Sequence, residues 1–287
     1  MKILITGAGS YVGEHVASYM QEKESDWLIY QLDVQSDEWK KFDFSPYDVV
    51  FHVAGLAHRK ITSEIEPLYY QVNRDLAIET AQKAKNSGVR HFIFMSSMSV
   101  YSDDVTYVDG ATPTNPDNAY GKSKLQAEEG ILPLAEEGFI VSVIRPPMIY
   151  GKDCKGNYNS LRSLALKLPV FPLVDNRRSM LFIDNFSAFV DQLIKTGKPG
   201  IFYPQNAELA NTSQWAKYIA EEHQKKLYLS RFLGWCAQVG KHVPGISGYC
   251  VKAFGDSYYD PAMSEYPDMS YQVATFRESI AKTEESK

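Results

Sequence analysis

Two side chains that can act together in proton transfer lie four residues apart. Tyr120 and Lys124 occur in YGKSK, where a helical pattern begins, and this spacing places both on one face of a helix. A free phenol has a pKa of about 10, so accepting a proton near neutrality requires a fall of roughly three units, about 4 kcal/mol. The Lys124 ammonium favours the phenolate by placing positive charge beside it. The pair predicts a tyrosine acid/base group, although exposed helices also carry this spacing by chance.

Two hydroxyl groups follow a run of strand-forming residues. The segment FIFMSSMSVY, residues 92–101, places Ser96 and Ser97 near the end of the strand. Open α/β sheets bind ligands at the carboxyl ends of their strands, so this position suits catalysis. The alternative is structural, because serines at strand ends commonly form turns.

A glycine-rich turn separates the first strand-like run from the first helical pattern. In TGAGSYVG, residues 6–13, the glycines have the spacing G-x-G-x-x-x-G. A dinucleotide pyrophosphate needs such a close main chain before a helix N-terminus, although any tight turn uses glycine. Because a serine at positive φ would strain the turn, we expect Gly9 to adopt that conformation and Ser10 to offer its hydroxyl to phosphate. The cofactor-binding candidates here are Gly7, Gly9, Ser10, Tyr11, Val12 and Gly13.

An acidic residue indicates which dinucleotide binds. Asp33 ends the next strand-like run in YQLDV, 20 residues after Gly13. A carboxylate at this place accepts hydrogen bonds from the adenosine ribose and repels a 2′-phosphate. The predicted cofactor is therefore NAD rather than NADP, and Lys124 is expected to hold ribose hydroxyls as well. The alternative for Asp33 is an exposed strand end without a ligand.

These candidates require a specific order of strands and helices to bring them together. Short runs rich in Ile, Val, Leu and Phe alternate with helical patterns, which is typical of βαβ units. Continuous apolar runs indicate a parallel sheet covered on both faces. We therefore predict an α/β fold, a Rossmann-like doubly wound parallel sheet. The predicted strands are residues 2–6, 27–33, 49–53, 91–97 and 140–144, and the helices are 11–21, 68–86 and 119–137.

The pattern loosens after Gly151. A helix from Asn185 and a strand near residues 200–203 are expected to rejoin the sheet, whereas the chain after residue 206 is rich in Tyr, Gly and Pro and has one helical stretch near residues 213–223. The predicted division is an NAD-binding Rossmann domain of residues 1–150, joined by 180–205, and a smaller C-terminal substrate-binding lobe of 151–179 and 206–287.

The composition excludes several classes of partner. The 287 residues include 30 basic and 35 acidic ones, a net charge of −5, so nucleic acid is not an expected ligand. Cys154, Cys236 and Cys250 are widely spaced without clustered histidines, which predicts reduced cysteines and no metal site. No signal segment begins the chain, and no window reaches roughly 18 consecutive apolar residues. A cytoplasmic protein without a membrane partner is expected.

The order of these motifs resembles that of the extended short-chain dehydrogenase/reductase family, which includes NAD-dependent nucleotide-sugar epimerases and dehydratases. The glycine turn is similar to the family's T-G-x-x-G-x-x-G, with Ser10 at its middle glycine, and IRPPMIYG at residues 144–151 follows in the family's order. The resemblance implies that Ser97, Tyr120 and Lys124 are catalytic. Ser97 would bind the reacting sugar hydroxyl beside the tyrosine.

The resemblance also implies further cofactor contacts. Ala54, Gly55 and Leu56, in HVAGLAH at residues 52–58, resemble a second cofactor-lining turn. The histidines of this segment could equally be hydrogen-bonded structural residues, and His58 is given no catalytic role. Asn73 in VNRD matches a family asparagine that supports the cofactor site.

On the substrate side, Arg178 resembles the arginine that grips the substrate diphosphate bidentately. The family often has an asparagine in R-P-x-N-x-Y-G where this chain has Met148, so Asn157 is the candidate replacement for that substrate contact. The family also implies a homodimer through the helices at residues 68–86 and 119–137.

The predicted reaction is epimerisation at C4 of a nucleotide sugar, a UDP-hexose or its N-acetyl form, through transient oxidation to the 4-keto sugar. Tyr120 would take the C4 hydroxyl proton. The runner-up is an NAD(P)H-dependent reductase of a 4-keto nucleotide sugar, which would use the same residues. A non-catalytic NAD-sensing module is a third possibility, against which the intact Tyr120 and Lys124 pair argues.

Elimination of water is not expected. In the family's 4,6-dehydratases an Asp-Glu pair follows the catalytic hydroxyl residue, whereas this chain has Met98 and Ser99 there. A thioether and an ordinary hydroxyl cannot supply the additional acid and base. Asp256 or Asp260 from the C-terminal lobe is the remaining alternative.

Overall fold

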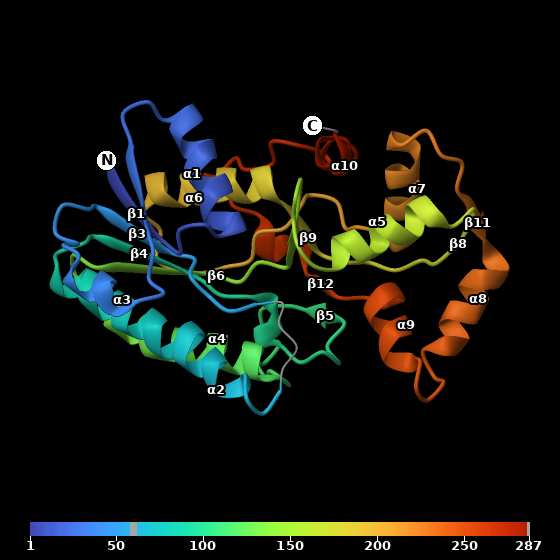
Figure 1. Cartoon of the computed structure of the whole chain (residues 1–287), viewed down its shortest axis with the longest axis horizontal. Helices are drawn as coiled ribbons and strands as arrows, with labels where there is room; N and C mark the ends of the chain where they lie inside the picture. The colour runs from blue at the N-terminus through green and yellow to red at the C-terminus, as the bar shows by residue number, and fades with distance from the viewer. Residues whose placement is uncertain (58–61, 286–287) are drawn as a thin grey trace.

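The computed structural model describes residues 1–57 and 62–285. Within them, a parallel six-stranded sheet has the strand order β2-β1-β3-β4-β6-β10 and occupies the left half of the view in Figure 1. The strands are β1 (Lys2–Thr6), β2 (Leu28–Leu32), β3 (Val49–His52), β4 (His91–Met95), β6 (Ile140–Ile144) and β10 (Gly200–Phe202). The chain order reverses between β1 and β3, where open sheets bind ligands beyond the carboxyl ends of the strands. The predicted doubly wound sheet is confirmed.

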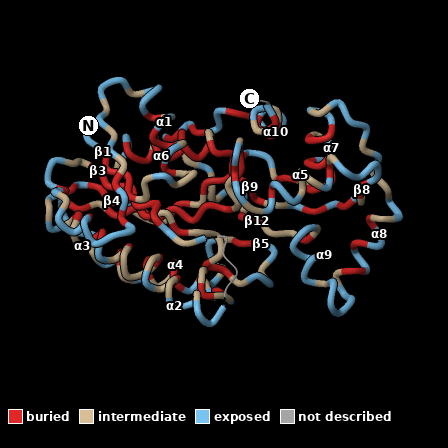
Figure 2. The backbone as a smooth tube through the Cα atoms, viewed as in Figure 1, coloured by how far each residue is buried: buried red, intermediate tan, exposed pale blue. Residues whose placement is uncertain are grey.

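Helices cover both faces of this sheet. They are α1 (Tyr11–Lys23), α3 (Leu76–Asn86), α4 (Ala119–Ile131) and α6 (Ile183–Thr196). Successive side chains of a strand point to opposite faces, so Ile3 and Ile5 of β1 pack in the cluster that contains α1 and α6, whereas Leu4 packs with α3 and α4. Figure 2 shows the resulting burial along the strands. Two covered faces explain the continuous apolar runs in the sequence.

The predicted helix over residues 68–86 is interrupted near its start. The chain forms α2 (Glu66–Tyr69) and a π-helical turn (Tyr70–Asp75) before α3 begins. Such π-turns occur frequently at functional sites, but hydrophobic periodicity gives no sign of one. The helix predicted to reach residue 137 ends at Ile131 instead, because Pro133 supplies no N–H group for another α-helical turn.

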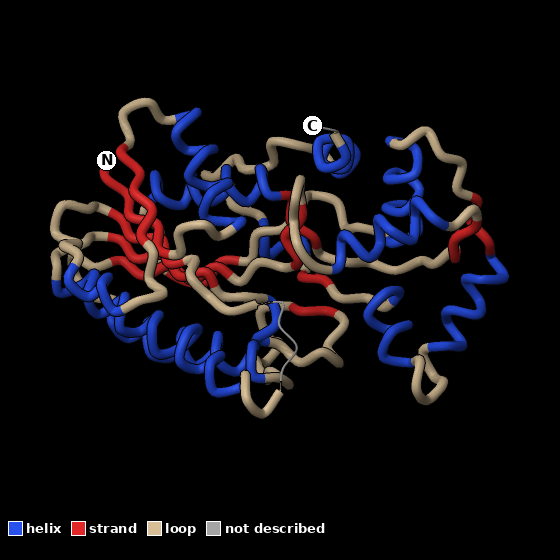
Figure 3. The backbone as a smooth tube through the Cα atoms, viewed as in Figure 1, coloured by secondary structure: helices blue, strands red, loops and turns tan. Residues whose placement is uncertain are grey.

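Smaller elements carry the other side of the molecule. Among the described residues, two-stranded parallel sheets pair β7 with β9, β8 with β11 and β5 with β12 (Figure 3). The strands are β5 (Tyr107–Val108), β7 (Met148–Tyr150), β8 (Val170–Pro172), β9 (Met180–Phe182), β11 (Tyr228–Ser230) and β12 (Tyr258–Tyr259). The helices are α5 (Asn157–Lys167), α7 (Thr212–Glu222), α8 (Arg231–Gly240), α9 (Ser247–Phe254) and α10 (Phe276–Glu284). Of these helices the sequence indicated only α7. It did not indicate α8, α9 and α10, and α5 lies where loops were expected after Gly151.

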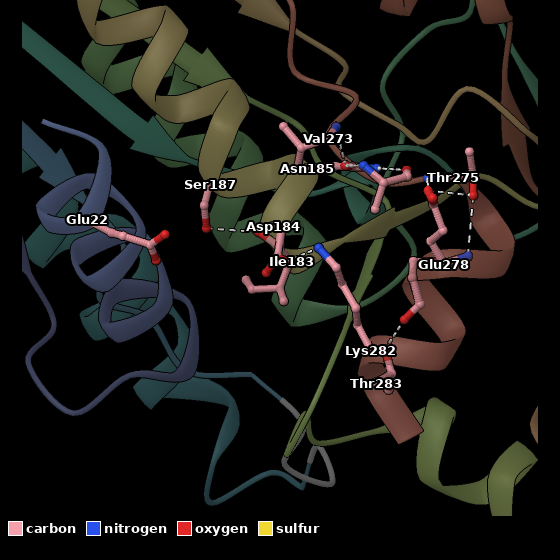
Figure 4. Close-up of polar contacts among 12 residues, drawn as sticks. Glu22, Ile183, Asp184, Asn185, Ser187, Val273, Thr275, Glu278, Lys282 and Thr283 are labelled. Carbon is pink, nitrogen blue, oxygen red and sulfur yellow. Dashed lines mark hydrogen bonds and ion pairs between the residues drawn. The ribbon is translucent and has the colours of Figure 1, made fainter. Parts of the chain in front are cut away.

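Polar contacts fix the C-terminal segment to α6 (Figure 4). The Asn185 side-chain oxygen accepts hydrogen bonds from the N–H groups of Val273 (2.9 Å) and Ala274 (3.0 Å), and Thr275 and Glu278 cap α10 reciprocally. One hydrophobic cluster consequently extends from β1 through α6 to α10. The division into a Rossmann domain and a substrate lobe stays a prediction, because this cluster includes residues of both.

Candidate functional site

The glycine-rich turn joins β1 to α1 in a conformation that suits phosphate binding. Gly7 and Gly9 have φ angles of 100° and 74°, whereas Ser10 is extended at −79°. Gly9 thus takes the left-handed conformation, as expected. The Ser10 hydroxyl oxygen accepts a hydrogen bond from the Gly13 N–H (3.2 Å) and caps α1. Its proton remains available to a ligand, and the first N–H groups of the helix, beginning at Tyr11 and Val12, lack intrahelical acceptors.

Close packing explains two of the glycines. A side-chain carbon on Gly7 would lie 2.9 Å from the Cα of Ala54, and one on Gly13 would lie 2.6 Å from the Ser10 hydroxyl oxygen. The turn therefore lies directly against the loop after β3. Gly9, between them, has no atom within 4 Å of its side-chain position. A pyrophosphate could therefore approach the main chain closely there, so the residues present fit the predicted dinucleotide.

Asp33 lies one residue beyond β2, the strand that pairs with β1. Its side chain is exposed, and one carboxylate oxygen accepts a hydrogen bond from the Gln35 N–H (2.9 Å). The other oxygen can accept a ribose hydroxyl. This position, next to the glycine turn at the carboxyl edge of the sheet, is compatible with the predicted ribose contact.

Asn73 connects the loop after β3 to α4. It is fully buried in the π-helical turn, where its oxygen accepts the Leu56 N–H (2.7 Å) and its nitrogen donates to the Leu56 carbonyl (3.1 Å) and the Ser123 hydroxyl (3.2 Å). A side-chain carbon on Gly55 would lie 3.1 Å from Asn73 Oδ1 and 3.3 Å from Lys124 Nζ. The structure thus brings this loop, Asn73 and Lys124 together. His58 lies outside the described residues.

The Lys124 ammonium is buried at the carboxyl end of β4. Its Nζ donates a hydrogen bond to the Met95 carbonyl (2.8 Å) and lies 4.8 Å from the centre of the Phe94 ring. Burial lowers the pKa of Lys124 to about 8, and the Glu128 carboxylate opposes part of this shift. Perturbed groups of this kind concentrate at functional sites. The ammonium has further donors that a ribose could accept.

Tyr120 and Ser97 face each other at this end of the sheet. Burial raises the pKa of the Tyr120 phenol, and a hydrogen bond with Ser97 lowers it in part. β4 ends at Met95, two residues earlier than predicted, because the Ser97 hydroxyl oxygen accepts the Ser99 N–H (3.1 Å) and caps a 3-10 turn. Ser97 therefore projects from a turn instead of a strand, with Lys124 one helical turn beyond the tyrosine.

Ser96, the other hydroxyl candidate, has a structural partner. It is buried and donates its proton to the Glu128 carboxylate. Glu128 forms a buried ion pair with Arg145 (2.6 Å), which also donates to the Tyr101 hydroxyl (2.9 Å). Sequence reasoning missed this pair. The i,i+4 spacing of Lys124 and Glu128, together with the arginine of IRPPMIYG, was the available signal.

The three substrate-side candidates lie on separate elements. Met148 begins β7 and is half-buried, whereas Asn157 begins α5 and is exposed. Arg178 donates to the Gly255 carbonyl (3.0 Å), and burial lowers its pKa although the Asp256 carboxylate opposes the shift. Among the described residues, no hydrogen bond joins any of the three to the catalytic candidates.

Three hydrogen bonds hold the segments around these elements to the carboxyl ends of β4 and β6. The Met98 N–H donates to the Pro146 carbonyl (2.9 Å), which holds the loop before β7 beside the turn that carries Ser97. Tyr259, fully buried, donates its hydroxyl to the Arg145 carbonyl (2.9 Å) and its N–H to the Ser179 hydroxyl (2.8 Å). Sequence reasoning missed Tyr259, because a tyrosine in a tyrosine-rich segment carries no recognisable motif.

The structure also bears on the cysteines, on possible metal-binding groups and on possible membrane-spanning helices. Cys154, Cys236 and Cys250 are free thiols. The described part of the chain contains no metal-binding group of three or more His, Cys, Asp or Glu residues. In residues 1–57 and 62–285 the structure has no helix of the length and hydropathy that a membrane crossing requires.

Comparison with known proteins finds relatives over most of the chain. A UDP-glucose 4-epimerase of Vibrio cholerae is 28% identical over 261 residues, which cover 82% of this chain and 79% of that protein. The N-acetyl-alpha-D-glucosaminyl-diphospho-ditrans,octacis-undecaprenol 4-epimerase of Escherichia coli O157:H7 is 29% identical over 286 residues, 88% of this chain and 85% of that protein.

A solved structure matches the fold, and a family description matches the sequence. The crystal structure of a UDP-glucuronic acid 4-epimerase from Bacillus cereus in complex with NAD superimposes with a TM-score of 0.74 at 17% identity, over 98% of this chain and 97% of that one. Residues 3–202 match the description "NAD dependent epimerase/dehydratase family". The match covers well over half of the sequence, and the chain therefore belongs to this family.

Proposed function

We propose that the chain is an NAD-dependent nucleotide-sugar 4-epimerase whose substrate is a UDP-hexose or its N-acetyl form. The observation that carries the proposal is the meeting of Ser97, Tyr120 and Lys124 at the carboxyl end of β4. The family and the two 4-epimerase relatives support the same reaction.

The residues that would hold NAD come from the edge where the strand order reverses. The turn from Gly7 to Gly13 would receive the pyrophosphate, Asp33 the adenosine ribose, and Lys124 the other ribose. Bound NAD would supply a reversible hydride acceptor for C4 of the sugar. Asn73 hydrogen-bonds both the loop after β3 and α4, so it would hold these two segments in place around the bound NAD.

The chain's own part in the reaction is proton transfer. Tyr120 takes the proton of the C4 hydroxyl and later returns it, while Ser97 holds the same oxygen. Burial opposes phenolate formation at Tyr120, as the raised pKa shows. The Ser97 hydrogen bond acts in the opposite direction. The positive charge of Lys124 would add to it once substrate and NAD are bound, so both residues are needed for turnover near neutral pH.

Arg178 would bind the diphosphate of the substrate. Its guanidinium is half-buried, and no carboxylate of the described residues forms an ion pair with it. An anionic ligand would compensate this buried charge. The name of the Escherichia coli relative places its sugar on a polyprenyl diphosphate, which presents the same diphosphate chemistry, so that substrate class is a second candidate.

Dehydration remains outside the proposed chemistry. Met98 and Ser99 carry no group that titrates near neutrality. The Asp256 carboxylate accepts the Arg177 N–H (2.8 Å), and Asp260 accepts the Tyr107 hydroxyl (2.8 Å). Both acids are therefore engaged in holding loops together.

A substrate panel followed by NMR tests the proposal. Purified protein with NAD is incubated with UDP-glucose, UDP-N-acetylglucosamine, dTDP-glucose and polyprenyl-diphosphate N-acetylglucosamine, and a 4-keto nucleotide sugar is offered with NADH. We expect a C4 epimer at equilibrium without net NADH formation and no 4-keto-6-deoxy product. Stoichiometric NADH oxidation without an epimer would instead establish the reductase. Calorimetric NAD binding without any turnover would indicate the sensor.

Two further properties stay predictions. Pairing of two chains through α3 and α4 follows from the family resemblance and is tested by light scattering of the purified protein. A cytoplasmic location is compatible with the three free cysteines.

A further inference from the structure

The α8–α9 hairpin, residues 231–254, exposes large apolar side chains. Phe232 and Trp235 of α8 are 68% and 62% exposed and stack on each other with ring centres 6.1 Å apart. Tyr249 of α9 is 80% exposed, and Ile246 in the connection is also exposed. Surface apolar residues are usually scattered singly, and clusters mark interaction sites.

The packing of α8 keeps these rings outside. Its inward positions are Gly234, Ala237 and Gly240. A side-chain carbon on Gly234 would lie 2.0 Å from the Leu173 carbonyl oxygen, and one on Gly240 would lie 2.7 Å from Cys250 Sγ. The helix therefore sits too close to β8 and α9 for large residues to turn inward. Figures 1 and 2 show the hairpin at one end of the molecule with long exposed stretches.

The hairpin and the residues that flank it carry a charge opposite in sign to that of the whole chain. Residues 224–255 contain five basic side chains and no Asp or Glu, although the chain carries a net charge of −5. The five are Lys225, Lys226, Arg231, Lys241 and Lys252. An amphipathic helix with aromatic residues and basic neighbours fits the interface of an anionic bilayer, where apolar burial and electrostatic attraction add.

We propose that the α8–α9 hairpin docks this protein on an anionic membrane surface. A second copy of the chain is a poorer occupant, because pairing two hairpins would bring like charges together. The expectation of no membrane partner rested on the lack of an apolar run long enough to span a bilayer. A surface-bound hairpin needs no such segment, and its short helices give no spanning signal.

The hairpin is attached directly to the substrate side of the site. Gly255, the residue after α9, accepts hydrogen bonds from Arg178 (3.0 Å) and Asn176 (3.2 Å), and the Ala253 carbonyl accepts one from Thr212 (3.0 Å). A hairpin fixed at the headgroup layer would consequently hold the Arg178 end of the site near the membrane. The hairpin would only position the site at the membrane and would take no part in the reaction. Membrane binding can therefore be measured without substrate or NAD.

Vesicle co-sedimentation of the full chain tests the proposal. The vesicles are phosphatidylcholine alone or phosphatidylcholine with phosphatidylglycerol, and the variants are Phe232→Ser/Tyr249→Ser and Arg231→Glu/Lys252→Glu. We expect binding to the anionic vesicles, weakened at least about tenfold by each double variant and by high salt. Leu28→Ser, at an exposed apolar residue of β2, is the matched control and should bind normally.

A spectroscopic readout locates the contact. Trp39 and Trp215 are buried, and Trp27 is half-buried just before β2, so brominated lipids should quench chiefly Trp235, and Trp235→Phe should remove most of the quenching. Unchanged melting temperatures would show that the variants are folded. Failure to bind anionic vesicles, equal binding by the variants, or a hairpin-dependent dimer in lipid-free light scattering would each overturn the proposal.

Discussion

The Nζ atom of Lys124 lies 2.8 Å from the carbonyl oxygen of Met95, so the central lysine of α4 is held at the last residue of β4. Lys124 is only 4% exposed, and this burial lowers the pKa of its ammonium group to about 8. The protein thus keeps a costly charge where a ribose and a phenolate would need it.

Replacing this lysine should stabilise the fold while damaging cofactor binding. In the unfolded chain the lysine pKa is about 10.4. Below pH 8 the buried charge therefore lowers the free energy of unfolding by about 3 kcal/mol. This penalty is relieved as the pH rises from about 8 to 10.4. Lys124→Met removes the penalty but also one hydrogen bond worth about 1 kcal/mol. Urea unfolding at pH 7 should show a gain of about 1–2 kcal/mol, and calorimetry a weakened NAD affinity. Lys122→Met, exposed on the same helix, is the control; destabilisation by Lys124→Met would contradict this view of the charge.

Buried histidines should make the fold sensitive to acid. Burial lowers the pKa of His52 to about 3 and that of His91 to about 4. The unfolded chain protonates near pH 6.5, so stability is lost as pH falls below that value, by up to about 1.4 kcal/mol per pH unit for each histidine. His52→Gln/His91→Gln should flatten the unfolding free energy between pH 6.5 and 4.5, whereas the exposed His242→Gln should not. An unchanged slope in the double variant would show that other groups cause the acid sensitivity.

Cofactor choice should depend on Asp33. Its exposed carboxylate at the end of β2 would repel a 2′-phosphate, so wild-type protein should bind NAD more tightly than NADP in calorimetry. Asp33→Ala should narrow the difference, and the exposed Asp26→Ala should leave it unchanged. A wild-type preference for NADP would refute the role of Asp33 and favour the reductase.

The buried ion pair below the site should be essential for stability. Glu128 and Arg145 are almost fully buried and 2.6 Å apart. Glu128→Gln leaves the arginine charge uncompensated, which should cost about 3–5 kcal/mol in chemical unfolding. Glu129→Gln, at the exposed neighbouring position, should cost little. A loss below about 1 kcal/mol for Glu128→Gln would mean that water or rearrangement solvates Arg145.

The sequence predicted the sheet well because its signals are local. The runs around Ile3, Val50 and Ile93 are apolar on both faces, and each is followed by a helical pattern. Contacts between residues far apart in the sequence gave no such signal. Asn73 was placed by resemblance, but its π-helical turn and its bond to Ser123 depend on tertiary contacts.

The C-terminal helices were missed for a different physical reason. α8 packs through Gly234 and Gly240 and turns Phe232 and Trp235 outward. Its apolar pattern therefore does not describe a buried face, which is the feature that sequence periodicity detects. Likewise, the role of Tyr259 depends on a hydrogen bond to a carbonyl 114 residues away.

The most direct measurement of the central claim is the fate of a deuterium placed at C4 of UDP-glucose or UDP-N-acetylglucosamine. A 4-epimerase that returns the same hydride should give the C4 epimer with the label retained at C4, no release to water and no net NADH. Tyr120→Phe should slow this conversion at least about a hundredfold while NAD still binds. Loss of deuterium to solvent, or the absence of an epimer from either sugar with NAD bound, would contradict the proposed function.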